Sequence, residues 1–286
     1  MTGPGMVDTL CNAFLARYAD VWDAAIAAQG VPVKVRRDPD DAFTEPDALV
    51  ARMDELGIAT IVLVAADPQD HPGAFDFSSL SFRLDDVAAL VDAHPGRFAA
   101  HWCLDAGLGM AGVRRAAEAL DHDWVVGLYN HVHSWDRPFD HADFYPYYAL
   151  AADADVPVMM QAGTSGGLMP SECGRPIGVD RPAIYFRDLR FVLSHTGWPW
   201  VDEAVAMALK FPNVFLGTAA YPPKYWAPAV LDFVRGPGRA KTIFATNFPT
   251  VGHRHACAQI AELDLAAETR DALVGGTARR VFTRLP

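Results

Sequence analysis

The strongest constraint on the fold of this chain is an alternation of short apolar runs with helical patterns from one end to the other. Alternation of this kind indicates parallel strands that are joined by right-handed helical crossovers. Eight such units in a chain of 286 residues are typical of a closed (β/α)8 barrel. The predicted strands span residues 6–10, 58–65, 98–103, 124–129, 156–161, 189–194, 214–218 and 242–246.

A doubly wound open sheet is the main competing fold. It would need a nucleotide-binding turn, and neither GxGxxG nor GxxxxGK[ST] follows any of the apolar runs. We therefore predict one α/β domain over residues 1–286, folded as a single, distorted TIM-type barrel. We expect a polar excursion at 35–43 after the first strand and a long Gly- and Pro-bearing loop at 162–182 after the fifth.

Charge and cysteine content narrow the range of partners. The net charge of −11 disfavours nucleic acid and anionic membranes. No apolar run approaches the length that spans a bilayer, and residues 1–6 lack the pattern of a signal peptide. The four cysteines are far apart without a CxxC pair, which disfavours a disulfide framework and a thiolate zinc site and favours the cytoplasm. We expect a small-molecule substrate as the partner, and barrels of this type also form homodimers.

Polar residues at the carboxyl ends of the predicted strands would meet at one mouth of a barrel. In segment 191–203 an apolar run ends at Ser194-His195, and a Gly-containing turn then leads into a helical pattern. Tyr129, His131 and His133 alternate by two, so they would face one side if their strand continues that far. The candidate mouth residues are Asn12, Asp67, His101, Tyr129, His131, His133, Gln161, His195, Thr218 and Asn247, with Trp198 at an aromatic rim suited to an apolar or conjugated ligand.

Each candidate also has a purely structural interpretation. His195 could cap its strand by bonding a backbone group, and His131 and His133 could be exposed loop histidines. Asp67 precedes a proline and could stabilise a turn. Gln161 and the other amide candidate, Asn247, could bond each other or the backbone.

Several motifs occur in an order that is shared with a known family. They are Ser194-His195-Thr196-Gly197-Trp198-Pro199-Trp200, Pro212-Asn213-Val214-Phe215-Leu216, Ala245-Thr246-Asn247-Phe248-Pro249 and Gly275-Gly276-Thr277-Ala278-Arg279-Arg280-Val281-Phe282. Through them the chain resembles the amidohydrolase superfamily, in the branch that includes aminocarboxymuconate-semialdehyde decarboxylase. The resemblance covers the whole chain and implies a barrel whose mouth binds a divalent metal.

The metal-binding positions implied by this resemblance are largely changed here. The family uses two histidines of an Asp-x-His-x-His motif, a histidine on the fifth strand, a histidine on the sixth and an aspartate on the last. In this chain those places hold Leu10, Asn12, Gln161, His195 and Asn247, in that order. Only the sixth-strand histidine, His195, is kept.

The substitutions predict that the mouth has lost its metal. A catalytic divalent ion needs about three protein ligands, whereas leucine offers none and neutral amide oxygens are poor zinc ligands. We therefore expect no metal and no other cofactor. One alternative remains open, in which His101, His131, His133 and His195 form a relocated site that keeps a metal-dependent hydrolase or decarboxylase activity.

Without a Lewis acid, reactions that need only proton transfer and hydrogen bonds remain accessible. We predict a metal-independent enzyme acting on a small carboxylate, lactone or conjugated compound, as a lyase, an isomerase or cyclase, or a lactone hydrolase. His195 is the candidate acid/base, with His131 and Tyr129 as catalytic partners, and the other mouth residues bind the substrate. The alternative is a non-catalytic barrel that binds a ligand or a partner protein.

Overall fold

The computed structural model describes residues 5–29, 42–67 and 77–286, and within them eight parallel strands form one sheet in the order β1 to β8. The ring closes where β1 meets the segment after β8: the Asn247 backbone N–H donates to Leu10 O at 2.8 Å, and Asn12 N–H donates to Phe248 O at 3.0 Å. The predicted barrel is therefore confirmed. The strands are β1 (Met6–Cys11), β2 (Ile58–Ala65), β3 (Phe98–Cys103), β4 (Val125–Asn130), β5 (Val158–Gln161), β6 (Phe191–Ser194), β7 (Val214–Gly217) and β8 (Thr242–Ile243).

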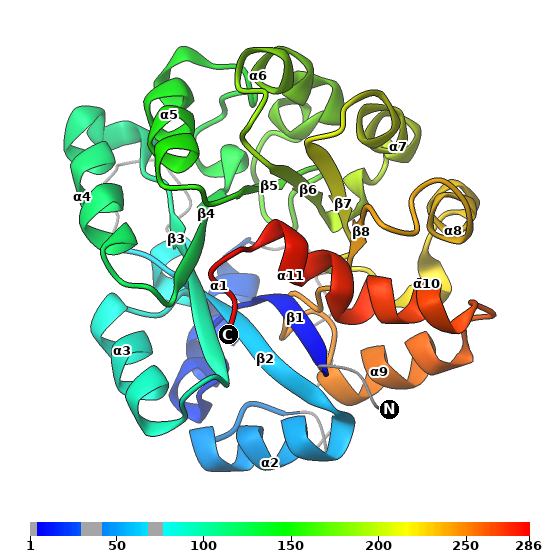
Figure 1. Ribbon diagram of the computed structural model, residues 1–286. Coiled ribbons are helices and arrows are strands. Elements are labelled where there is room, and N and C mark those ends of the chain that lie inside the picture. The colour runs from blue at the N-terminus through cyan, green and yellow to red at the C-terminus, as the bar shows by residue number, and fades with distance from the viewer. Residues whose placement is uncertain (1–4, 30–41, 68–76) are drawn as a thin grey trace.

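Helices surround the strands and join one to the next (Figure 1). Amphipathic sequences explain the placement of several of them: in α8, for example, Val230, Phe233 and Val234 are buried while Arg235 is exposed. None of the helices in the described part of the chain is long and apolar enough to span a membrane. The helices are α1 (Ala19–Gln29), α2 (Pro46–Leu56), α3 (Leu84–Ala93), α4 (Met110–Leu120), α5 (Tyr145–Asp153), α6 (Asp180–Tyr185), α7 (Val201–Lys210), α8 (Pro228–Arg235), α9 (His253–Glu262), α10 (Ala267–Asp271) and α11 (Thr277–Val281).

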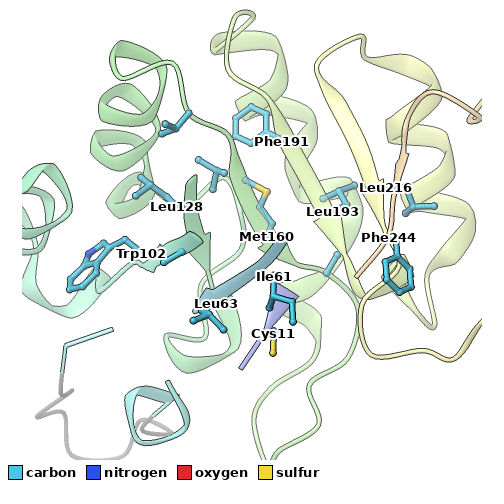
Figure 2. Close-up of a cluster of buried hydrophobic side chains, with 14 of the residues drawn as sticks. Cys11, Ile61, Leu63, Trp102, Leu128, Met160, Phe191, Leu193, Leu216 and Phe244 are labelled. Carbon is cyan, nitrogen blue, oxygen red and sulfur yellow. The ribbon is translucent and has the colours of Figure 1, made fainter. Parts of the chain in front are cut away.

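The strand side chains alternate between two apolar layers. In β2, Ile61 and Leu63 belong to the outer layer between the strands and the helices, and Figure 2 shows part of this layer. Val62 and Val64 belong to the inner layer, which fills the barrel itself. This period of two explains why β2 is apolar at nearly every position, since both of its faces are buried.

The amino-terminal end of the barrel is closed by the end of the chain. Figure 1 shows α11 lying across the strands, and its residues Ala278 and Val281 join the inner layer together with Phe282. Because this end is filled by apolar side chains, ligands have access to polar groups only at the carboxyl ends of the strands, as in other barrels of this type.

Three local expectations were wrong or lie outside the described residues. The last strand ends at Ile243 rather than at residue 246, because the Phe244 N–H donates to Leu273 O instead of continuing the ladder. The loop expected at 162–182 is shorter, since α6 begins at Asp180. Most of the excursion expected at 35–43 lies outside the described residues.

Candidate active site

A buried pair of polar side chains links the ends of β4 and β5. Tyr129 and Gln161 both face the barrel interior, and the Tyr129 hydroxyl donates to Gln161 Oε1 at 2.7 Å. Burial is the main cause that raises the pKa of Tyr129 well above its usual value. The hydroxyl is therefore neutral at physiological pH, and it acts as a hydrogen-bond donor.

Three histidines gather beside this pair. His131 and His133 follow β4, their ring centroids are 5.6 Å apart, and the end of β6 brings in His195. All three are buried, so the structural alternative of exposed loop histidines is wrong for His131 and His133.

Burial keeps these imidazoles neutral. It lowers the pKa of His195 from 6.5 to about 3, and the nearby His133 adds to this effect. Burial also lowers the pKa of His131 well below its usual value, with further contributions from the other two rings. The pKa of His133 is lowered mainly by burial as well. At neutral pH the cluster is therefore uncharged, and any one imidazole that takes up a proton disfavours protonation of its neighbours.

Each of the three imidazoles is oriented by a hydrogen bond at one of its two ring nitrogens. His133 Nε2 donates to Gly163 O at 2.9 Å, since a carbonyl oxygen can only accept. His131 Nδ1 bonds the Ser134 hydroxyl at 2.6 Å, and His195 Nδ1 bonds the Ser194 hydroxyl at 2.8 Å. Within the described residues, Nε2 of His195 makes no hydrogen bond. This nitrogen is therefore the group best placed to exchange a proton with a ligand.

The backbone at His195 is held in an uncommon conformation. His195, Thr196 and Gly197 have φ values of 62°, 54° and 74°, so three consecutive residues lie in the left-handed region. For residues other than glycine this costs about 1–3 kcal/mol each, and such strain persists only where surrounding contacts impose it.

A second polar pair lies at the seam between β1 and the segment after β8, across the ring from β4 and β5. Asn12 Nδ2 donates to Asn247 Oδ1 at 3.0 Å and to Phe248 O at 2.9 Å, and Asn247 Nδ2 donates to the Thr250 hydroxyl at 3.3 Å. Asn247 has a φ of 55°, a conformation that asparagine tolerates better than most residues. The Asn247 amide thus bonds Asn12 and Thr250, while Gln161 bonds Tyr129, so the structural alternative in which Gln161 and Asn247 bond each other is wrong.

These groups do not fit the divalent metal of the family resemblance. Leu10 is an apolar member of the inner layer. The amide oxygens of Gln161 and Asn247 already accept hydrogen bonds from Tyr129 and Asn12. The set therefore offers one imidazole and no carboxylate, fewer than the three ligands that a catalytic ion needs. Among the described residues, no group of three His, Cys, Asp or Glu side chains is placed to hold a metal, so the geometry gives the relocated histidine site no support either.

Four predicted site residues lie apart from the histidine cluster or at its rim. His101 is fully buried in the barrel, where Nε2 donates to Thr9 O at 2.9 Å and the ring centroid is 5.2 Å from that of Phe282. The carboxylate of Asp67 forms surface ion pairs with two arginines. The hydroxyl of Thr218 accepts from Ala245 N–H at 3.3 Å, a bond that joins the end of β7 to the segment after β8. Trp198 is half exposed, 6.2 Å from the Tyr221 ring.

Sequence reasoning missed a buried network that supports the seam. The carboxylate of Asp8 accepts from the Thr246 backbone N–H at 2.9 Å and from the Thr246 hydroxyl, and His253 Nε2 lies 3.3 Å from it. The His253 ring also stacks on Phe248, with centroids 4.9 Å apart. The motif containing Thr246 and Asn247 was visible in the sequence, but nothing there connects it to a histidine on α9. Ser194 was also missed as a partner, although it directly precedes His195.

Comparison with known proteins gives one family and a set of similar folds. A family model described as amidohydrolase matches residues 7–284, which confirms the resemblance that was drawn from the motifs. No curated protein sequence matches the chain.

Solved structures with this fold include an uncharacterised TIM-barrel protein from Bordetella bronchiseptica, with 22% identity, a TM-score of 0.76, and coverage of 98% of this chain and 99% of that one. A 5-carboxyvanillate decarboxylase from Sphingomonas paucimobilis has 17% identity, a TM-score of 0.66 and coverage of 98% and 99%. The enzyme of the same name from Novosphingobium aromaticivorans, complexed with manganese and 4-hydroxy-3-methoxy-5-nitrobenzoic acid, has 15% identity, a TM-score of 0.70 and coverage of 98% and 96%. At these identities the likeness concerns the fold.

Proposed function

Since the chain belongs to the amidohydrolase family, we propose that it is an enzyme of that barrel whose buried histidines move protons on a small organic acid. The reaction class that we propose is that of a lyase, with loss of a carboxyl group as carbon dioxide. No metal at the family's position takes part. The decarboxylases among the similar structures support this class, although they differ from this chain in at least 83% of aligned positions.

The observation that carries the proposal is the buried, neutral cluster of His131, His133 and His195, in which Nε2 of His195 makes no hydrogen bond to the described residues. A buried, uncharged site disfavours a carboxylate and favours its neutral acid or its conversion to carbon dioxide, because charge is costly in surroundings of low polarity. A non-catalytic scaffold has no need of three buried histidines whose charged forms are all disfavoured. Burying them costs stability at acidic pH, a cost that a functional site explains.

The proposed step uses His195 to carry one proton. Nε2 takes the proton from the carboxyl group of the bound acid, and the bond between the carboxyl carbon and its neighbour breaks. The electron pair stays on the neighbouring carbon, which then receives the same proton from the imidazolium. Carbon dioxide leaves, and the histidine returns to its neutral form. One positioned acid/base of this kind contributes about 10²–10⁴-fold to the rate.

The polar neighbours have supporting roles in this proposal. Gln161 Oε1 accepts a hydrogen bond from the Tyr129 hydroxyl. The Gln161 amide hydrogens can then donate to another acceptor, such as a carbonyl oxygen of the substrate. His131 lies beside the same pair, with its ring centroid 6.3 Å from that of Tyr129. These groups orient an uncharged substrate without fixing a charge near it.

The Gln161 amide also favours a second candidate, the opening of a reactive lactone. In that reaction His195 would take a proton from the attacking water, while the amide hydrogens stabilise the developing negative charge on the carbonyl oxygen. Both candidates need the same free nitrogen of His195. They differ in whether carbon dioxide or a ring-opened acid is formed.

A substrate panel tests the proposal. Aromatic and unsaturated carboxylic acids are assayed for carbon dioxide release, and lactones are assayed for acid release, both in the presence of a chelator. We expect turnover of at least one acid, and a loss of about 10²–10⁴-fold in kcat for His195→Asn. His122→Gln is the matched control, since this exposed histidine precedes β4 at the opposite end of the barrel. Tight ligand binding without turnover would instead support the non-catalytic alternative, and full activity of His195→Asn would refute the role of His195.

A further inference from the structure

The strained turn at His195 has few bonds of its own. The Ser194 hydroxyl bonds His195 Nδ1, and the turn's other internal contact is a long hydrogen bond from Trp198 N–H to His195 O, at 3.3 Å. With two non-glycine residues in the left-handed region, a turn held by so little would relax toward ordinary conformations. Contacts from another segment must therefore keep it in place.

The loop after β5 supplies those contacts through its backbone. Thr164 N–H donates to Trp198 O at 2.8 Å, directly at the end of the strained turn. The approach is so close that a Cβ atom on Gly163 would lie 2.2 Å from Trp198 O and 2.9 Å from the carbonyl carbon of Gly197. Glycine at position 163, with a φ of 89°, is what allows the loop and the turn to meet.

His133 holds this loop from the other side. Its Nε2 donates to Gly163 O at 2.9 Å, while Gly163 N–H donates to Gly174 O at 2.7 Å. A Cβ atom on Gly174 would lie 2.3 Å from Gly163 O and 2.5 Å from His133 Nε2, so this contact too leaves no space for a side chain. His133, Gly163, Thr164 and Trp198 thus form a continuous series of contacts from the β4 loop to the turn after β6.

We propose that His133 is a positioning residue for His195, which it holds in place through Gly163, Thr164 and Trp198, and that it is not a substrate-binding residue. The direction of its one donated hydrogen bond is decisive. The Nε2 hydrogen is used on the loop backbone, and Nδ1 is buried without a hydrogen-bond partner among the described residues, so neither ring nitrogen is exposed to a ligand. The ring of His133 therefore links the loop after β4 to the loop after β5 and fixes their relative position.

This inference rests on the proposed function for its kinetic consequences, but its structural part can be tested without a substrate. The amide hydrogen of Thr164 reports directly on the contact with Trp198. Its exchange rate with solvent deuterium is measured in wild type, His133→Leu, His133→Gln and His122→Gln. Leucine fills most of the ring volume without a donor, whereas the glutamine amide can donate to Gly163 O in place of Nε2.

We expect the protection of the Thr164 amide to fall about tenfold in His133→Leu, as for loss of one supporting hydrogen bond, and to be restored in His133→Gln. The nitrogen chemical shifts of the His195 ring should change in the leucine variant alone. Gly174→Ala serves as a second variant in case His133→Leu does not fold, because its methyl group separates Gly163 O from His133 while leaving the histidine in place. Unchanged Thr164 protection in the folded His133→Leu protein would overturn the proposal.

Kinetics on an identified substrate separate positioning from direct contact. A displaced His195 should lower kcat by about 10²-fold with little change in KM, since misplacement of about 1 Å has effects of that size. A rise in KM alone, with Thr164 protection kept, would mean that His133 touches the substrate and would also overturn the proposal. If no substrate is found, the proposed function fails, and the exchange measurement still decides the role of His133.

Discussion

The buried histidines should make the stability of this protein unusually sensitive to mild acid, and His101 offers the clearest test. Its ring is fully enclosed in the barrel, away from the proposed catalytic cluster. Burial lowers the pKa of His101 from 6.5 to about 4, although its hydrogen bond to Thr9 O offsets part of the effect. The perturbation that we propose is His101→Gln, which keeps a donor for Thr9 O and removes the titrating group.

The sign follows from proton binding in the two states. Between pH 4 and pH 6.5 the unfolded chain binds a proton at His101 and the folded chain does not, so the free energy of unfolding falls as the pH is lowered through this window. Above pH 6.5 neither state is protonated, and the effect vanishes. A tenfold difference in proton affinity is worth about 1.4 kcal/mol, which gives a loss of about 2 kcal/mol at pH 5 and about 3 kcal/mol at pH 4.

Urea unfolding at pH 7.5 and at pH 5 measures this loss. Wild type and His101→Gln are compared, so that contributions from His131, His133 and His195 cancel. We expect the wild type to lose about 2 kcal/mol more than the variant between the two pH values. Equal losses in the two proteins would refute the reasoning, since they would mean that His101 takes up a proton as readily in the folded barrel as in the unfolded chain.

Three further substitutions test other parts of the structure. Gly163→Ala should destabilise the fold by more than about 1–3 kcal/mol, the cost of a positive φ alone, because the added Cβ also meets backbone atoms. Gly109 has a φ of 51° and no atom within 4 Å of an added Cβ, so Gly109→Ala should show only that conformational cost. The melting temperatures of the two variants measure the difference. Asp8→Asn should cost about 2–3 kcal/mol in urea unfolding, because the amide replaces a buried carboxylate that accepts two bonds from Thr246; an unchanged midpoint would rule out a stabilising role for this network. Asn247→Asp should not create hydrolase activity or metal binding, and assays with added zinc or manganese would reveal either.

The fold was predictable because its signal is repeated along the chain. A continuous β-branched run such as 58–65 marks a strand buried on both faces, and its observed bounds are the predicted ones. Features of the fold that depend on a single contact or on a very short element could not be predicted from the sequence. The early end of β8 at Ile243 depends on a bond from Phe244 to Leu273, and α6 is only six residues long, too short for a helical period to stand out.

The sequence predicted which residues make up the candidate site, but only part of how they are arranged. Alternation by two was expected to bring Tyr129, His131 and His133 to one side if the strand continued, but β4 ends at Asn130, and a 3-10 turn at Val132–Ser134 brings in the two histidines instead. The motif at Ser194-His195 supplied the third imidazole. The same reasoning also placed His101 at the mouth. In the structure this residue lies within the barrel, because it is still inside β3 rather than after its end. Pairwise contacts such as Asn12 with Asn247 join positions 235 residues apart, and no local pattern encodes them.

The central claim is that His195 works at the mouth of this barrel without the divalent ion of its family. The most direct measurement is elemental analysis of protein purified without chelator and dialysed, combined with turnover of the same sample before and after adding back zinc or manganese. The donor set of Leu10, Asn12, Gln161, His195 and Asn247 predicts metal well below one equivalent and turnover that added metal does not change. One equivalent of tightly held zinc or manganese, on whose return the activity depends, would contradict the account.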